Sequence, residues 1–233
     1  MSAVRKPASA HGLFRATGKT AKPVMVGLVD GEAVYDEAPA RESDDFYPTP
    51  PEPIRALLHA EGGRLRQFTR GIWECAAGDG ALVREMQACG LTVHASDLID
   101  RGCGATIRDF YAYGSADAPA DAIVTNPPFS ESGWGNGRAR WIVHARETIC
   151  VPYMALLMPI SWPGPAGMAA VWDRDPPARI YLMRWKIDFT GQGAPPSYHA
   201  WYVWDGNTPP GETRMLMLDR KDGRQADLFG EAS

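Results

Sequence analysis

The sequence lacks the features that mark several large classes of protein. None of its 233 residues falls in an apolar run of the about 18 residues that a transmembrane helix needs, and the N-terminus has no apolar signal-peptide core. No two of its four cysteines form a CxxC pair, and none lies in a Cys/His cluster with zinc-ligand spacing. We therefore expect a cytoplasmic protein with reduced thiols, no membrane association and no metal site.

An excess of positive charge is also missing. The formal net charge is −4 and the pI is about 5.7, which argues against a generic nucleic-acid-coating protein but not against an enzyme with a local basic cleft. With 45% hydrophobic residues the chain is able to bury a sizeable core, and no internal repeat is visible. We expect a flexible arm over residues 1–40 (with a hairpin strand at residues 24–29), one domain over residues 41–218 and a tail over residues 219–233.

The domain is organised around residues 123–129, which read Ile-Val-Thr-Asn-Pro-Pro-Phe. A buried strand should end at Asn126, because Pro127 fixes φ and lacks the N–H that a strand ladder needs. The turn then presents polar groups at the carboxyl end of a strand, where open α/β sheets bind ligands. A planar amine suits this turn, since Asn126 Oδ1 and the Pro127 carbonyl accept its two N–H groups and Phe129 stacks on its ring. A plain strand followed by a proline-rich turn is the alternative.

The segment upstream predicts a cofactor site at the same edge of the sheet. Residues 72–80 read Ile-Trp-Glu-Cys-Ala-Ala-Gly-Asp-Gly, and a helical pattern follows that stops at Gly90. A strand, a glycine loop and a helix form the first half of a Rossmann-like unit. The third glycine of the dinucleotide fingerprint is absent, which favours a smaller, cationic nucleoside over a pyrophosphate. Glu74 at the strand end suits a positively charged ligand.

Two further acids follow predicted strands. Asp97 ends the strand after the glycine loop and lies about 20 residues beyond Gly78, the spacing at which an acid meets ribose hydroxyls. Asp109 and Phe110 follow a third short strand and are candidates to hold and stack an adenine ring, although an ordinary polar strand end is the alternative. Further strands are expected at residues 153–160, 179–183 and 199–204, with one more at residues 214–218.

Two further segments of the sequence each allow two interpretations. The stretch Phe-Tyr-Pro-Thr-Pro at residues 46–50 is either the capped entry to a helix, with Thr49 or Pro50 before its first turn, or a rigid aromatic lip over a ligand. Residues 130–140, with Trp134, Arg138 and Arg140, form either a loop that closes over a substrate or a plain surface loop.

Taken together, these segments resemble S-adenosylmethionine-dependent DNA adenine-N6 methyltransferases, and specifically compact phage- or prophage-type members. The resemblance covers residues 45 to about 205. It implies a Rossmann-like class I methyltransferase fold, with a mostly parallel seven-stranded sheet and helices on both faces. It also implies S-adenosyl-L-methionine as cofactor, and it connects the chain to restriction–modification enzymes. The implied cofactor residues are Tyr47, Pro48, Thr49, Glu74, Ala76, Gly78, Gly80, Asp97, Asp109 and Phe110, and the implied catalytic residues are Asn126, Pro127, Pro128 and Phe129.

The resemblance implies methyl transfer to the N6 amine of an adenine that has been flipped out of a DNA duplex. Related motifs occur in methyltransferases that act on RNA bases or on protein glutamine, and these remain alternatives, as does a non-catalytic DNA-associated binding module. No large target-recognition domain is visible, so the recognition sequence is not indicated. In the tail, Gln225-x-x-Leu228-Phe229 resembles the short peptide that docks bacterial DNA-metabolising enzymes on the sliding clamp, with packing on the domain as the default.

Overall fold

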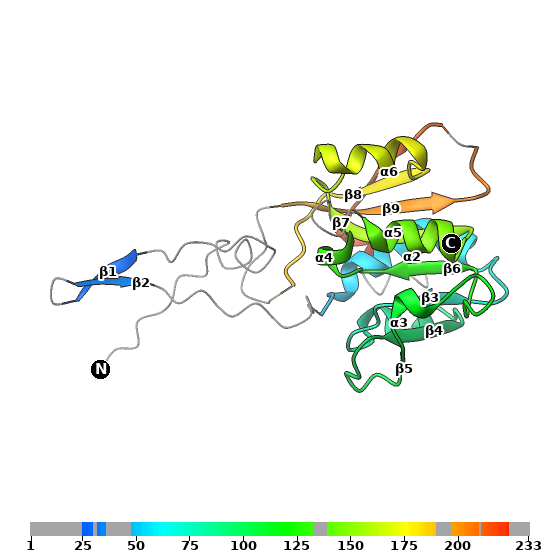
Figure 1. Cartoon of the computed structure of the whole chain (residues 1–233), viewed down its shortest axis with the longest axis horizontal. Helices are drawn as coiled ribbons and strands as arrows, with labels where there is room; N and C mark the ends of the chain where they lie inside the picture. Colours follow the sequence, from blue (N-terminus) through cyan, green and yellow to red (C-terminus); the bar gives the residue numbers. More distant parts are fainter. Residues whose placement is uncertain are drawn as a thin grey trace.

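A computed structural model describes residues 25–29, 32–35, 48–132, 139–189, 197–209 and 211–223. In the N-terminal arm, β1 (Met25–Val29) and β2 (Glu32–Tyr35) pair antiparallel, as the hairpin pattern predicted. The domain itself is a sheet with helices packed against it (Figure 1). Among the described residues, no helix combines the length and the apolar character required to cross a membrane.

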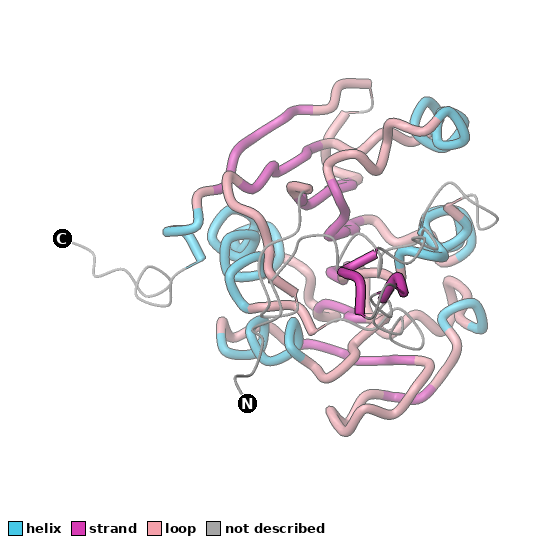
Figure 2. Tube along the Cα trace, turned by 90° about the vertical axis from the view of Figure 1, so that its left-hand side faces the viewer, coloured by secondary structure: helices cyan, strands magenta, loops and turns pink. Residues whose placement is uncertain are grey.

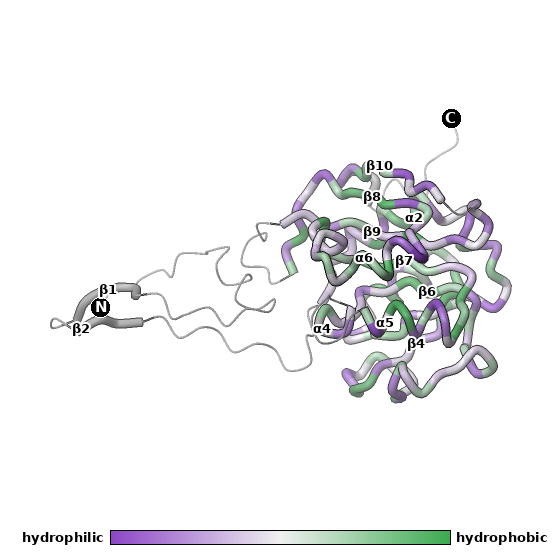
Figure 3. The backbone as a smooth tube through the Cα atoms, turned by 45° about the horizontal axis from the view of Figure 1, so that its top comes forward, coloured by the Kyte–Doolittle hydropathy of each residue, from purple (hydrophilic) through white to green (hydrophobic). Residues whose placement is uncertain are grey.

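Among the described residues, the sheet has eight strands in the order β10-β8-β9-β7-β6-β3-β4-β5. Of these eight strands, β9 runs antiparallel to its neighbours β7 and β8, and the other neighbouring pairs are parallel. The predicted mostly parallel sheet is therefore confirmed, but the predicted count of seven strands is wrong. Strands β5 and β10 form the two edges of the sheet, and β10 lies along its margin (Figure 3). The bounds are β3 Ile72–Glu74, β4 Val93–Asp97, β5 Thr106–Ile107, β6 Ala122–Thr125, β7 Tyr153–Pro159, β8 Arg179–Met183, β9 His199–Asp205 and β10 Arg214–Leu218.

Helices cover both faces of the sheet, as predicted (Figure 2). Along β6, Ile123 packs into one apolar cluster while Ala122 and Val124 pack into the other, and all three are fully buried. This is the environment of a parallel strand between two helical layers, where both side-chain faces must be apolar. The helices are α2 Pro51–Leu65, α3 Ala81–Ala88, α4 Phe129–Ser132, α5 Arg140–Val143 and α6 Ala169–Arg174, with a π-helical turn at His144–Thr148 and 3-10 turns at Phe110–Ala112, Ala166–Met168 and Arg220–Gly223.

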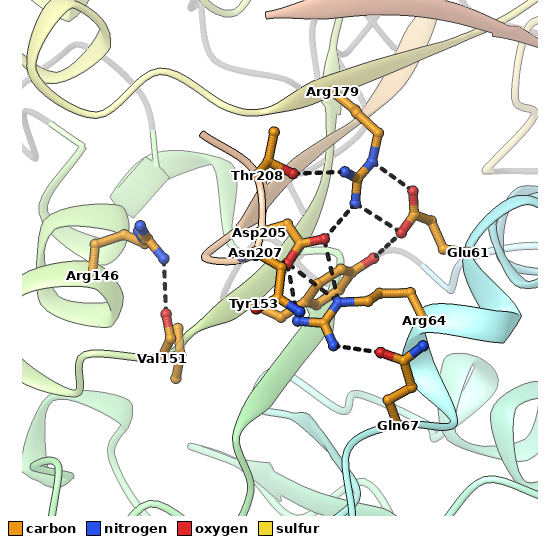
Figure 4. Close-up of polar contacts among 10 residues, drawn as sticks. All are labelled: Glu61, Arg64, Gln67, Arg146, Val151, Tyr153, Arg179, Asp205, Asn207 and Thr208. Carbon is orange, nitrogen blue, oxygen red and sulfur yellow. Dashed lines mark hydrogen bonds and ion pairs between the residues drawn. The ribbon is translucent and has the colours of Figure 1, made fainter. Parts of the chain in front are cut away.

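A network of charged side chains ties α2 to the edge of the sheet where β7 and β8 begin and β9 ends (Figure 4). Glu61 of α2 accepts hydrogen bonds from Arg179 at 2.7 and 3.0 Å, and Arg179 also donates to Asp205 at 2.9 Å. Arg64, one helical turn after Glu61, donates to Asp205 at 3.0 Å. Two carboxylates thus balance two guanidinium groups, so the network carries no net charge into a largely buried position.

Candidate active site

The opposite edge of the sheet gathers the predicted site residues. Because β3, β4 and β6 are neighbours and parallel, their carboxyl ends place Glu74, Asp97 and Asn126 along one edge. The N-terminus of α2 reaches the same edge, since Asn126 Nδ2 donates a hydrogen bond to Thr49 Oγ1 at 3.0 Å. Side chains from four separate segments therefore meet where a Rossmann-like sheet binds its ligand.

Asn126 presents an unused acceptor. Its Nδ2 is engaged by Thr49, whereas its Oδ1 is buried and has no hydrogen-bond partner among the described residues. The Pro128 carbonyl accepts from the backbone N–H groups of Glu131 and Ser132, which starts α4 directly after the turn. Phe129 is partly buried against the core. The turn is thus fixed on both sides, and the buried amide oxygen of Asn126 lacks a donor among the described residues.

Thr49 does not cap α2. The cap position is Pro50, which makes no side-chain cap bond, and the Thr49 hydroxyl contacts Asn126 instead. The predicted helix entry is confirmed, since α2 begins at Pro51 with Glu52 in its first turn, but Thr49 does not act as its side-chain cap. Thr49 itself is buried with 7% exposure, while Pro48 is exposed.

Glu74 is a buried carboxyl group, 1% exposed, at the end of β3. Its Oε1 accepts a hydrogen bond from the Ala76 N–H at 3.0 Å. Burial raises the pKa of Glu74 to about 8, and the nearby Asp97 charge adds to this, while interactions with Thr125 and the Ala76 N–H act in the opposite direction. Glu74 is therefore mostly protonated at neutral pH, and a cation placed beside it would favour its ionised form.

This raised pKa makes folding stability depend on pH. Between pH 4.5 and about 8 the folded chain holds a proton on Glu74 that the unfolded chain has released, so this group lowers stability as pH rises. We expect Glu74→Gln, which cannot titrate, to gain stability relative to the parent by up to about 1.4 kcal/mol per pH unit across that window. Urea unfolding at pH 5, 6.5 and 8 measures the difference. Glu212→Gln, at an exposed position, is the control, and parallel curves for Glu74→Gln and the parent would contradict the prediction.

The glycine loop between β3 and α3 is held by Asp97. The Gly78 N–H donates to Asp97 Oδ2 at 2.7 Å, and the Ile99 N–H donates to Oδ1 at 2.9 Å. Gly78 and Gly80 have φ of +56° and +81°, and a Cβ on Gly80 would stand 2.9 Å from the Cβ of Cys103. Sequence reasoning assigned Asp97 to a ribose and missed that its carboxylate also fastens the loop to β4.

Asp109 and Phe110 lie in different environments. Asp109 is exposed, and its Oδ1 accepts from the Tyr111 N–H at 2.9 Å. Phe110 is buried and stacks on Trp141 of α5, with ring centroids 4.2 Å apart and an interplanar angle of 11°. Trp141, which the sequence did not single out, therefore covers one face of the Phe110 ring. Stacking of a ligand on Phe110 stays a prediction.

A polar and aromatic group lies beside Phe110, and of its members the sequence pointed to Arg140 but not to Tyr111 or Glu131. Tyr111 donates its hydroxyl hydrogen to Glu131 Oε2 at 2.7 Å, and the Arg140 guanidinium lies 3.8 Å from the centre of the Tyr111 ring. These contacts join the segment after β5 to α4 and α5, the two helices that flank residues 133–138 in the sequence. Tyr47, Trp134, Arg138 and the tail residues 225–229 lie outside the described residues, so the lip tyrosine, the loop and the clamp motif stay predictions.

No protein-family model and no curated protein sequence matches this chain. Solved structures do match this chain. One is a protein from Listeria monocytogenes assigned as a class I S-adenosylmethionine-dependent methyltransferase, which superposes with a TM-score of 0.52 at 15% identity over 76% of this chain and 67% of that one. The chain has the class I methyltransferase fold. The type IIG restriction endonuclease BpuSI superposes with a TM-score of 0.54, also at 15% identity and over 76% of this chain. This chain spans about a quarter of that enzyme, 27% of its length.

In the class I methyltransferase fold, the carboxyl edge of the sheet is the expected place for the ligand. The described residues at this edge include a buried carboxyl group, a glycine loop and a buried amide acceptor. Within the described part of the chain, no group of three or more histidine, cysteine, aspartate or glutamate residues is arranged to hold a metal ion.

Proposed function

We propose that this protein transfers a methyl group from S-adenosylmethionine to the exocyclic N6 amine of an adenine flipped out of DNA. The main support is Asn126, whose buried Oδ1 lacks a donor among the described residues. A buried acceptor without a partner costs about 1–3 kcal/mol, and an exocyclic amine would supply the missing donor. The likeness of the fold to a type IIG restriction endonuclease supports DNA as the substrate class.

The glycine loop and its surroundings fit a cationic nucleoside cofactor. A cation near Glu74 would recover the ionised state that burial disfavours, and the positive φ of Gly78 and Gly80 leads the backbone into a tight turn in front of α3. In this proposal the cofactor is held in three parts. The methionine end is held by Tyr47, Pro48, Glu74, Ala76, Gly78 and Gly80, the ribose by Asp97, and the adenine by Asp109 and Phe110. Thr49, predicted from the sequence for the methionine end, contacts Asn126 instead.

S-adenosylmethionine supplies a methyl group on a positively charged sulfur. The target amine is a weak nucleophile because its lone pair is delocalised into the ring. Hydrogen bonds from its two N–H groups to Asn126 Oδ1 and the Pro127 carbonyl localise the lone pair, aim it and stabilise the positive charge that develops. With the cofactor bound, the methyl group would pass to this nitrogen, the electron pair of the carbon–sulfur bond would stay on sulfur, and the nitrogen would then release a proton to solvent.

The adenine has to leave the duplex before its amine reaches this turn. Unpairing and unstacking a base costs a few kcal/mol. Stacking on an aromatic ring returns about 1–3 kcal/mol per base, and Phe129 directly after the turn is the ring that we assign to this role. Phe129 is partly buried against the core, so its ring is held in place rather than free in solvent.

The test is transfer of labelled methyl groups from S-adenosylmethionine to unmethylated double-stranded DNA, followed by nucleoside analysis. We expect the label in N6-methyladenine. RNA and a mixed protein substrate are run in parallel under the same conditions, and cofactor binding is measured separately by calorimetry. Label in RNA or in glutamine would reject DNA as the substrate and retain methyl transfer. Cofactor binding without transfer to any substrate would favour a non-catalytic module.

A further inference from the structure

We propose that Thr49 is a positioning residue, whose hydroxyl accepts from Nδ2 of Asn126 and holds the amide in place, so that Oδ1 is left for the substrate. The inference deepens the proposed function and rests on it. The two ends of an asparagine amide have nearly the same size and opposite hydrogen-bonding character, since the oxygen only accepts and the nitrogen only donates. The end that faces the substrate therefore decides whether the site binds a donor or an acceptor.

The contacts of Asn126 divide its two ends clearly. Nδ2 donates to Thr49 Oγ1 at 3.0 Å, whereas the buried Oδ1 has no partner among the described residues. Thr49 is 7% exposed, so little water reaches this hydrogen bond. With Nδ2 held in this way, the site offers an acceptor. It accordingly favours an amine, and it disfavours a carbonyl oxygen at the same place, because two acceptors would then face each other.

Thr49 is suited to this role because the start of α2 is anchored on three sides. The Trp201 indole N–H of β9 donates to the Pro53 carbonyl at 2.9 Å. Arg55 forms a two-pronged ion pair with Glu85 of α3 at 2.6 and 2.9 Å. Glu52 accepts from Arg220 at 2.9 Å, which fixes the exposed side of the helix.

The prolines beside Thr49 complete the anchoring. Pro50 and Pro51 restrict the backbone between Thr49 and the first turn of α2, so the hydroxyl has little freedom to move away from Asn126. The hydroxyl is thus held at a defined point relative to β6, although Thr49 and Asn126 are 77 positions apart in the sequence.

This role differs from the sequence prediction that Thr49 binds the cofactor, and the two roles predict different kinetics. We expect Thr49→Val to lower kcat by about ten- to a hundredfold, since misaligned reacting groups lose rate steeply, while the dissociation constant of S-adenosylmethionine stays within about twofold. Thr49→Ser keeps the hydroxyl and should restore most of kcat. Thr213→Val is the matched control, because the Thr213 hydroxyl donates to the Pro177 carbonyl at 2.7 Å and belongs neither to α2 nor to the charged network.

A second measurement requires no substrate. In 15N-labelled protein, the Asn126 side-chain amide is identified by its disappearance in Asn126→Asp. We expect its proton signals to shift and its exchange with water to rise about tenfold in Thr49→Val, and both to stay near the parent values in Thr49→Ser. An unchanged amide in Thr49→Val overturns the positioning role, whether or not methyl transfer is observed. A loss of cofactor affinity with unchanged kcat and an unchanged amide would instead make Thr49 a cofactor residue. Absence of transfer by the parent protein, with the amide changed as expected, would reject the proposed function and leave the Thr49 contact intact.

Discussion

Asn126→Ala is expected to lower the rate of methyl transfer at least about a hundredfold, the loss typical when a group that stabilises charge in the transition state is removed. The alanine removes the acceptor that orients the amine but leaves the glycine loop, Glu74 and Asp97 in place. Binding of S-adenosylmethionine should therefore stay within about twofold of the parent. Single-turnover transfer and calorimetric cofactor binding measure the two quantities.

Asn126→Asp provides the matched control. A carboxylate keeps an acceptor toward the substrate, and the Thr49 hydroxyl is able to donate to it, since a hydroxyl both donates and accepts. We expect a smaller loss of rate than with alanine. If Asn126→Ala turned over at near the parent rate, the amine would not be held by this side chain, and the proposed mechanism would be wrong.

Removal of Glu61 should be the most destabilising single change in the charged network. Glu61 is 4% exposed, pairs with Arg179, and accepts hydrogen bonds from the Tyr153 and Tyr181 hydroxyl groups. Glu61→Ala leaves Arg179 largely buried and opposite Asp205 alone, and breaking a buried ion pair in this way costs about 3–5 kcal/mol. Urea unfolding followed by far-UV circular dichroism measures the loss.

A double variant separates the contribution of the Glu61–Arg179 ion pair from the cost of leaving Arg179 buried without its partner. Arg179→Met removes the guanidinium, so Glu61→Ala should cost less in that background than in the parent, by at least about 1 kcal/mol of coupling. Glu147→Ala is the control at an exposed pair with Arg174, where side-chain exposure is 50% and 58%, and it should cost less than about 1 kcal/mol. Equal losses for Glu61→Ala and Glu147→Ala would show that the network adds no stability.

Much of the site edge was predictable because glycine and proline mark where its strands end. The strand at residues 72–74 was found from the glycine loop behind it, and the strand before Asn126 from the prolines behind that residue. Both signals are local, since a residue that stops a strand does so through its own backbone.

The contacts between segments were not predictable in the same way. Thr49 before a helix suggested a local cap, and only the packing of α2 on the sheet brings its hydroxyl to Asn126. Phe110 looked free to stack on a ligand, and only the placement of α5 sets Trp141 against its face. The strand count failed for a related reason: the sequence shows which segments form strands but not which of them join the edges of one sheet.

Helix α2 connects the charged network at Glu61 with Thr49 at the opposite edge of the sheet. The ten steps from Pro51 to Glu61 correspond to about 15 Å at the helical rise, so a tilt of roughly 4° about Glu61 would displace the start of the helix by roughly 1 Å. A shift of that size is enough to break a 3.0 Å hydrogen bond while the fold remains intact. Changes around Glu61 that are too mild to unfold the domain would therefore reach the opposite edge of the sheet as a loss of alignment.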